Sequence, residues 1–224
     1  CLVGSEMCIR DRINTHSLKD NLSIMERNTM RLLDLTNQLL DFRKTEAQGF
    51  QLNFMICDIS QLIKDTYIRF DPAAKQNDLT FKIGLPEQNF NAAVDKEALT
   101  KILSNLFNNA VKYAKSYIHV SLHAPTDEQN DFFSITVSND GLPIPVEMKE
   151  KIFEPVVQIK NVSNGQTKTG TGIGLPLARS LTELHRGKLY LKDSDDICFC
   201  IELPIKQEKT ILLQKTEIEK PVNT

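Results

Sequence analysis

Apolar residues recur mostly three or four positions apart along one stretch near the start of the chain, with charged residues between them. They are Leu18, Leu22, Met25, Leu32, Leu35, Leu39 and Phe42. This spacing predicts a long amphipathic helix over residues 18–42. Because the near-heptad spacing persists over several turns, the apolar stripe indicates packing against other helices of a bundle.

From about residue 50 the pattern changes to a mixed order of strands and helices. Alternation of apolar and polar residues predicts strands at 50–54, 79–83, 117–123, 131–138, 188–192 and 197–203. Helical spacing predicts helices at 60–70, 95–114, 147–152 and 173–184. This order of elements favours a sheet with helices covering one of its faces.

The side-chain charges are nearly balanced, with 27 Lys and Arg against 29 Asp and Glu. This balance provides no basic surface of the kind that binds nucleic acid or an anionic membrane. No stretch approaches the roughly 18 consecutive apolar residues of a membrane span, and residues 1–12 lack the apolar core of a signal peptide. The five cysteines show no metal-binding spacing, so we interpret them as reduced thiols of a soluble, cytoplasmic chain.

The two ends of the chain do not fit the pattern of the residues beside them. Residues 1–12 match no neighbouring element and are expected to be non-native or disordered. Residues 206–224 are charged except at Ile211–Leu213 and are expected to form a linker or tail. The predicted core of the protein therefore lies between these ends, in a domain that starts near residue 50.

One face of the helix predicted at 95–114 carries polar groups that need a partner. Asn105, Asn109 and Lys112 lie within about one turn of each other on that face. An unpaired buried amide costs roughly 1–3 kcal/mol, so a stripe of two amides and a cation indicates a polar ligand. The alternative is that the stripe is simply the solvated side of a surface helix.

A glycine-rich segment, Gly170-Thr171-Gly172-Ile173-Gly174-Leu175, directly precedes and opens the helix predicted at 173–184. Glycines at this place allow backbone N–H groups and the positive end of the helix to approach a phosphate closely. A dinucleotide-binding motif is excluded because a loop composition, not a strand, precedes the glycines. A phosphate-binding loop is excluded because no Gly-Lys-Ser/Thr follows at the required spacing.

Four segments, taken in chain order, resemble the motifs of a known ATPase family. Asn105–Tyr113 is similar to its N box and Ser138–Gly141 to its first glycine box. Ile152–Pro155 is similar to its F box and Gly170–Leu175 to its second glycine box. The chain therefore resembles the GHKL ATPases, which include histidine kinases, type II topoisomerases, mismatch-repair proteins and a heat-shock chaperone.

The resemblance covers residues 50–205 and implies an α+β fold. This fold is a two-layer α/β sandwich, the Bergerat fold of histidine-kinase-type ATPases, in which the nucleotide lies between helices and a lid. The polar stretch 156–169 matches the lid, and an ordinary surface loop is the alternative. Residues 13–46 resemble the second helix of a dimerisation and histidine-phosphotransfer bundle, so a long bundle helix is expected before the domain.

The resemblance also implies ATP and Mg²⁺ as ligands of the domain. Asn109 is expected to bind Mg²⁺, and Asn105 and Lys112 are expected to contact the phosphates. Tyr113 is expected to pack against adenine, with a plain core tyrosine as the alternative. The ATP-binding residues implied in this way are Asn105, Asn109, Lys112, Tyr113, Asn139, Gly141, Ile144, Phe153, Gly170, Thr171, Gly172, Ile173, Gly174 and Leu175.

One position separates the kinases of this family from its hydrolases. The hydrolases carry a glutamate four residues before the asparagine that binds Mg²⁺, and that glutamate activates water. Here the position is Asn105, whose neutral amide cannot act as a general base. The resemblance therefore implies a protein histidine kinase, which transfers the γ-phosphate of ATP to a histidine on a bundle helix in two-component signalling.

The first glycine box departs from the family pattern at two positions. Asn139 stands where the family has the aspartate that reads the adenine amino group, and Pro143 stands where it has a second glycine. An amide oxygen can accept the same hydrogen bond but contributes no charge. Asp140 is an alternative reader of the base. These departures leave open a second interpretation, a catalytically inactive nucleotide-binding module with a regulatory or scaffold role.

No histidine matches the acceptor pattern of sensor kinases, in which an acidic residue directly follows the histidine. His16 is followed by Ser17, Leu18 and Lys19. We therefore expect the chain to be incomplete upstream and unable to phosphorylate itself. The partners implied are a bundle helix that carries the acceptor histidine, a response regulator or fused receiver domain, and a second copy of the parent protein. That parent is expected, by analogy, to be an inner-membrane sensor.

Overall fold

The computed structural model describes residues 3–46, 51–125, 131–157, 162–163, 166–167 and 171–207. The chain divides into two compact units, Cys1–Asp41 and Phe42–Thr224. The first unit is helical, and the second contains the sheet and the other helices. Residues 208–224, where the sequence predicts a tail, lie outside the described residues.

A single long helix, α1, runs from Val3 to Glu46. It is longer than the helix predicted at 18–42 and continues through residues 3–12, which match no element in the sequence pattern. The apolar stripe of the first unit is exposed, with Leu18, Met25 and Leu32 each more than 60% open to water. A row of exposed leucines on one helix favours the predicted packing against other helices.

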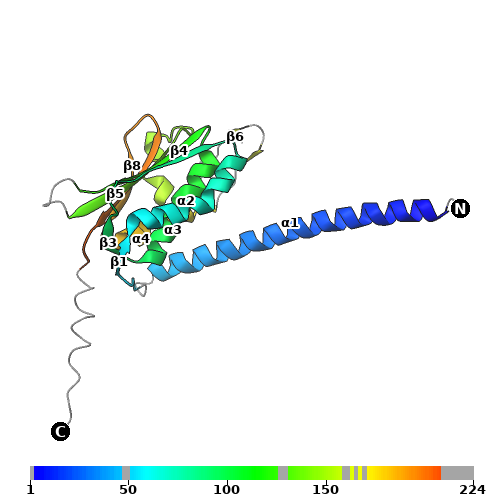
Figure 1. The fold of residues 1–224 in the computed structure, drawn as a ribbon, viewed down its shortest axis with the longest axis horizontal. Coiled ribbons are helices and arrows are strands. Elements are labelled where there is room, and N and C mark those ends of the chain that lie inside the picture. The colour runs from blue at the N-terminus through cyan, green and yellow to red at the C-terminus, as the bar shows by residue number, and fades with distance from the viewer. Residues whose placement is uncertain are drawn as a thin grey trace, which may run out of the picture. The chain divides into compact units, whose positions relative to one another are not determined.

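The second unit is built on a five-stranded sheet (Figure 1), in the order β2-β4-β5-β9-β8. Its strands are Thr80–Gly84 (β2), Tyr117–His123 (β4), Phe132–Asn139 (β5), Ile197–Pro204 (β9) and Lys188–Lys192 (β8). The β2–β4 pair is parallel, and the other three pairs are antiparallel. The predicted strands of this sheet are confirmed to within about one residue at each end.

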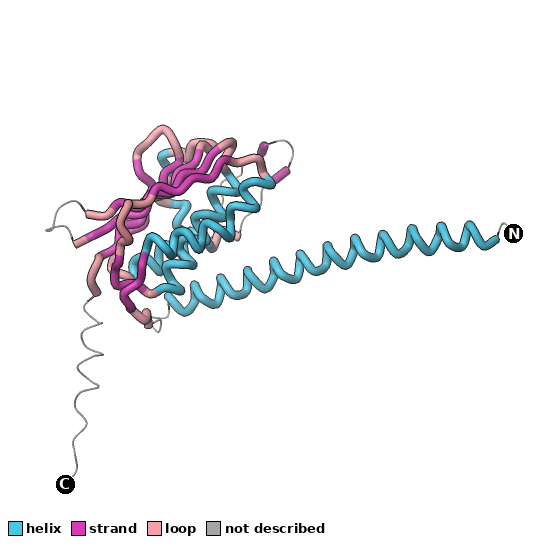
Figure 2. The backbone as a smooth tube through the Cα atoms, viewed as in Figure 1, coloured by secondary structure: helices cyan, strands magenta, loops and turns pink. Residues whose placement is uncertain are grey.

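Three helices cover one face of this sheet (Figure 2), namely Ile59–Gln76 (α2), Lys96–Tyr113 (α3) and Gly174–Leu184 (α4). The inward positions of the strands alternate with outward ones, as expected for a sheet with one buried face. In β5, for example, Phe133, Ile135 and Val137 are buried. The expected two-layer α/β sandwich is therefore confirmed.

Side-chain carboxylates fix where two of the helices begin. Asp58 accepts a hydrogen bond from the backbone N–H of Gln61 and caps α2. Asp95 caps α3 by accepting from the N–H of Ala98, and its second oxygen accepts from the N–H of Asn53. These caps satisfy helix-end donors that otherwise lack partners. Asp95 thereby also links Asn53, near the beginning of the predicted domain, to the start of α3.

The sequence pattern is wrong or incomplete in several places. The predicted strand at 50–54 is not formed at residues 51–54, and a strand follows instead at Met55–Asp58 (β1). Its antiparallel partner, Asn91–Val94 (β3), was not predicted. The helix predicted at 147–152 is two short 3₁₀ turns, Val146–Met148 (η1) and Lys151–Phe153 (η2).

Among the described helices, none is long and apolar enough to cross a membrane.

Candidate functional site

The polar stripe of α3 is held in place by the buried face of the same helix. Leu99, Ile102, Leu103, Leu106 and Phe107 of α3 are fully buried. Asn105, Asn109 and Lys112 are half-buried on the remaining side. Because the buried face fixes the rotation of the helix about its axis, the two amides and the cation are presented together, as the sequence predicts.

The second glycine box brings the start of α4 against this stripe. Gly174 is the first residue of α4, and a Cβ atom built there would lie 2.9 Å from Oδ1 of Asn105. Any larger residue would therefore push the Asn105 side chain away. Just before the helix, Ile173 donates its backbone N–H to the Thr171 hydroxyl at 3.2 Å. Leu175 packs against the hydrophobic core, and Gly170 lies outside the described residues.

A backbone contact joins the first residue of the predicted lid to the second glycine box. Val156 donates its N–H to the carbonyl oxygen of Gly172 at 2.9 Å. Both residues have left-handed backbones, with φ of 67° at Val156 and 71° at Gly172. A Cβ on Gly172 would lie 2.9 Å from Cα of Val156, so only glycine permits this approach. A left-handed valine is strained, and the contact holds the strained conformation in place.

Part of the predicted lid, residues 156–169, is described. Val162–Ser163 (β6) pairs antiparallel with Gln166–Thr167 (β7). Residues 158–161, 164–165 and 168–170 lie outside the described residues. The role of the segment as a lid stays a prediction.

The first glycine box lies where β5 ends beside the end of α3. Asn139 is 2% exposed, and its Oδ1 accepts a hydrogen bond of 3.0 Å from the backbone N–H of Gly141. A Cβ on Gly141 would lie 2.7 Å from the carbonyl oxygen of Tyr113 and 2.8 Å from Oδ1 of Asn139. Glycine is therefore required for β5 to approach the last turn of α3 this closely.

Asp140 holds the turn that follows α3 through hydrogen bonds. Its carboxylate accepts hydrogen bonds from the backbone N–H groups of Lys115, Ser116 and Tyr117 and from the Ser116 hydroxyl. Burial raises the pKa of Asp140, but these hydrogen bonds outweigh burial and lower the pKa far below its usual value. The carboxylate is thus committed to the turn between α3 and β4, which argues against the alternative that Asp140 reads a base.

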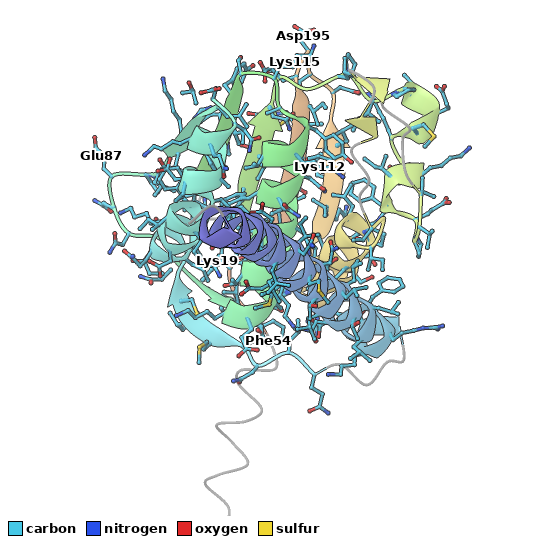
Figure 3. The ribbon with its side chains drawn as sticks, turned by 90° about the vertical axis from the view of Figure 1, so that its right-hand side faces the viewer. Lys19, Phe54, Glu87, Lys112, Lys115 and Asp195 are labelled. Atoms are coloured by element: carbon cyan, nitrogen blue, oxygen red, sulfur yellow. The ribbon has the colours of Figure 1, made fainter. Side chains whose placement is uncertain are left out.

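The last turn of α3 combines a cation with an aromatic ring. The Nζ atom of Lys112 lies 4.8 Å from the centre of the Tyr113 ring. Figure 3 labels Lys112 on α3 and, past the end of the helix, Lys115. Tyr113 is half-buried, so part of its ring remains open to a ligand. A ring that is partly open and partly covered suits stacking against a planar base.

Two other predicted site residues belong mainly to the core. Phe153 is 6% exposed, and its ring meets that of Phe199 edge-on at 6.2 Å. The guanidinium of Arg179 lies 5.0 Å from the centre of the Phe153 ring and also pairs with Glu150 at 3.0 Å. Ile144 is half-buried against the core. Phe153 therefore anchors the segment before the predicted lid to α4.

Arg179 is a residue of this site that sequence reasoning missed. It lies in the middle of α4, and its guanidinium contacts the ring of Phe153 in the F box. No local motif marks it, because Phe153 and Glu150 are distant in sequence and its i,i+4 pair with Glu183 is that of an ordinary surface arginine. The strained Val156 was missed for the same reason, since a left-handed valine leaves no trace in the sequence.

The chemistry of the site fits a nucleotide with a hard divalent cation. Amide oxygens on α3 are the kind of ligand that Mg²⁺ accepts together with phosphate oxygens. A glycine-opened helix start beside them suits a phosphate group. Among the residues that the structure describes, no group of three or more His, Cys, Asp or Glu side chains is placed to hold a metal by itself.

Comparison with known proteins identifies relatives of this arrangement. Residues 94–207 match the model of the family described as histidine kinase-, DNA gyrase B-, and HSP90-like ATPase. The sensor histidine kinase TmoS of Ectopseudomonas mendocina is 34% identical over 188 residues. That match covers 81% of this chain but only 19% of TmoS, so the chain spans about a fifth of this relative.

Solved structures share the fold. The nucleotide-free catalytic domain of the histidine kinase ThkA superimposes with a TM-score of 0.61 at 25% identity, over 70% of this chain and 99% of that domain. Full-length ShkA in complex with AMPPNP gives a TM-score of 0.68 at 22% identity, over 78% of this chain and 36% of ShkA. The family match over residues 94–207 includes the polar stripe and both glycine boxes.

Proposed function

Because the chain belongs to the family of histidine kinase-, DNA gyrase B- and HSP90-like ATPases, we propose that it is the ATP-binding catalytic part of a sensor histidine kinase. In this role it holds ATP with Mg²⁺ and transfers the γ-phosphate to a histidine on a dimerisation bundle helix. One observation carries the proposal: α4 begins at Gly174, directly against the Asn105 amide of the polar stripe.

The residues of the stripe bind different parts of the triphosphate and its metal ion. Asn109 offers its amide oxygen to Mg²⁺, and Asn105 and Lys112 contact the phosphates. The first turn of α4 adds backbone N–H groups and the positive end of its dipole. Mg²⁺, held by Asn109, would supply positive charge that neutralises the phosphates during transfer. Tyr113 stacks on the base, and Asn139 and Gly141 lie at the edge of the base.

The same residues explain why the proposed reaction is transfer and not hydrolysis. Water becomes a useful nucleophile when a general base removes its proton. Position 105 is an asparagine, which cannot serve as that base. Catalysis then rests on positioning and charge neutralisation, so ATP persists in the site until a histidine is presented.

Further parts of a sensor kinase are proposed around this chain. The exposed leucine stripe of α1 supports a helical bundle formed with a second copy, on which the acceptor histidine lies. The name of TmoS supports a sensor as the parent protein. A structure of ThkA in complex with the response regulator TrrA supports a response regulator or receiver domain as the next phosphate acceptor. A membrane location for the parent rests on analogy with sensor kinases.

Transfer can be tested by supplying the acceptor in a second polypeptide. The chain is incubated with radiolabelled ATP, Mg²⁺ and a separately produced helical bundle that carries an acceptor histidine. We expect label on the bundle histidine that is stable to alkali and labile to acid, with little release of free phosphate. An Asn109→Ala variant should not transfer, whereas Asn108→Ala should, because Asn108 is the exposed neighbour on the same helix.

A second function is favoured by one departure from the family pattern. Asn139 brings no negative charge to the place where the family uses an aspartate. A nucleotide-binding module with a regulatory or scaffold role would bind ATP but leave the supplied bundle unlabelled. Rapid and sustained phosphate release without any acceptor would instead contradict both functions and indicate an ATPase of the topoisomerase or chaperone type.

A further inference from the structure

The orientation of the Asn139 amide is fixed by the backbone that faces it. Its oxygen, Oδ1, accepts the N–H of Gly141 at 3.0 Å. The reverse orientation would place the NH₂ group against another N–H donor, which cannot form a hydrogen bond. The backbone hydrogen bond therefore assigns oxygen and nitrogen within this amide.

Gly141 has no room to turn away and release this oxygen. A Cβ at Gly141 would already meet the Tyr113 carbonyl oxygen at 2.7 Å and Cδ1 of Ile197 at 3.1 Å. The backbone is thus confined between the end of α3 and β9. If Asn139 rotated to present its oxygen elsewhere, the N–H of Gly141 would lose its acceptor in a crowded place, which is unfavourable.

The remaining group of the amide is a donor. Within the described part of the chain, the Asn139 side chain forms its hydrogen bond with Gly141, and Oδ1 is the atom that accepts it. The one enclosed side-chain polar atom without a partner in the described part of the chain is Oγ of Ser60. Because Asn139 is 2% exposed, Nδ2 is at most slightly open to water, and its N–H groups are the side-chain donors that Gly141 leaves for a ligand.

Resting on the proposed function, in which Asn139 lies at the edge of the base, we propose that the site accepts 6-keto purine nucleoside triphosphates at least as tightly as ATP. Adenine carries an amino donor at C6, which meets the donor of Asn139 unfavourably. Hypoxanthine and guanine carry a keto oxygen at C6, which can accept from Nδ2. An aspartate has two acceptor oxygens and can bind both Gly141 and an amino group, so the asparagine changes the selectivity.

Inosine triphosphate is the matched probe because hypoxanthine differs from adenine only at C6 and N1. Titration calorimetry with Mg²⁺ compares it with ATP, on the intact chain and on Asn139→Asp. The intact chain should bind inosine triphosphate as tightly as ATP or more tightly. The aspartate variant should prefer ATP by roughly 10-fold, the usual effect of mispairing one buried polar group.

The comparison of two nucleotides on the intact chain keeps the test valid even if the buried aspartate destabilises the variant. A preference of the intact chain for ATP by 10-fold or more overturns the inference and leaves the proposed function standing. Equal selectivity in the intact chain and a folded Asn139→Asp variant also overturns the inference, because Asn139 then does not set selectivity. Failure of the intact chain to bind any purine triphosphate rejects the proposed function as well.

Discussion

Asp140 ties the end of the polar-stripe helix to the end of β5, so its replacement tests how the site is held together. The Asp140→Asn change keeps the size and shape of the side chain. In the intact chain, backbone N–H groups donate to both carboxylate oxygens of Asp140. The asparagine keeps only one of these oxygens, and its NH₂ group is a donor that faces backbone N–H groups. We expect the variant to be folded but less stable than the intact chain.

The size of the loss follows from the hydrogen bonds. A hydrogen bond to a charged acceptor contributes about 1.5–3 kcal/mol, and replacing the carboxylate forfeits most of one such bond. Because the carboxylate is partly open to water, we expect a loss of about 2 kcal/mol in the free energy of unfolding. In a domain of this size, that corresponds to a fall of about 4–8 °C in the melting temperature.

The dependence on pH gives a sharper signature. The pKa of Asp140 is lower in the folded chain than in the unfolded chain, so the folded state favours the ionised form. The advantage of the intact chain over Asp140→Asn should be complete above about pH 5 and shrink as the pH falls below about 4, the usual aspartate pKa.

The assay is urea unfolding of both proteins from about pH 2.5 to pH 7, a range that spans the usual aspartate pKa. Asp193→Asn is the matched control, because Asp193 forms an exposed ion pair with Lys149 and its loss should leave the transition unchanged. A loss below about 0.5 kcal/mol at pH 7 for Asp140→Asn, or an advantage that grows toward pH 4, would refute the reasoning about this carboxylate.

Three further predictions concern single positions. Gly187→Ala should abolish stable folding or cost roughly 3 kcal/mol by chemical denaturation, because a Cβ there would lie 2.2 Å from the carbonyl oxygen of Glu202. Desolvation lowers the pKa of the fully buried His185, so the stability of the folded chain should fall as the pH drops from about 7 toward 5. In thermal melts across that range, the melting temperature of a His185→Gln variant should depend less on pH. Gly174→Ala should displace the Asn105 amide and weaken ATP binding by roughly 10-fold in calorimetry while barely changing the melting temperature. A large drop in its melting temperature would show that the contact is structural.

Much of the fold was predictable because strong periodicity accompanies long elements. The strands at β4 and β5 alternate apolar and polar residues over most of their length, and the pattern places them correctly. By contrast, β3 is short and reads Asn-Ala-Ala-Val, with no alternation to detect. Residues 50–54 alternate, yet the described part of this segment is held by the Asp95 carboxylate and not by strand pairing.

The site was predictable wherever a motif is local in sequence. The stripe of α3 and the glycine start of α4 were found in this way, because each lies within a few turns of one helix. What the motifs do not reveal is how the segments meet. The left-handed backbone of Val156, the task of Asp140 and the orientation of Asn139 all depend on partners supplied by tertiary packing, which no spacing rule encodes.

The proposed function requires that the polar stripe of α3 binds a nucleotide together with Mg²⁺. The most direct test is calorimetric titration of ATP with and without Mg²⁺, on the intact chain, Asn109→Ala and the control Asn108→Ala. We predict Mg²⁺-dependent binding that is kept in Asn108→Ala and weakened by at least roughly 10-fold in Asn109→Ala. Binding that is absent in the intact chain, or unchanged in Asn109→Ala, would contradict the claim.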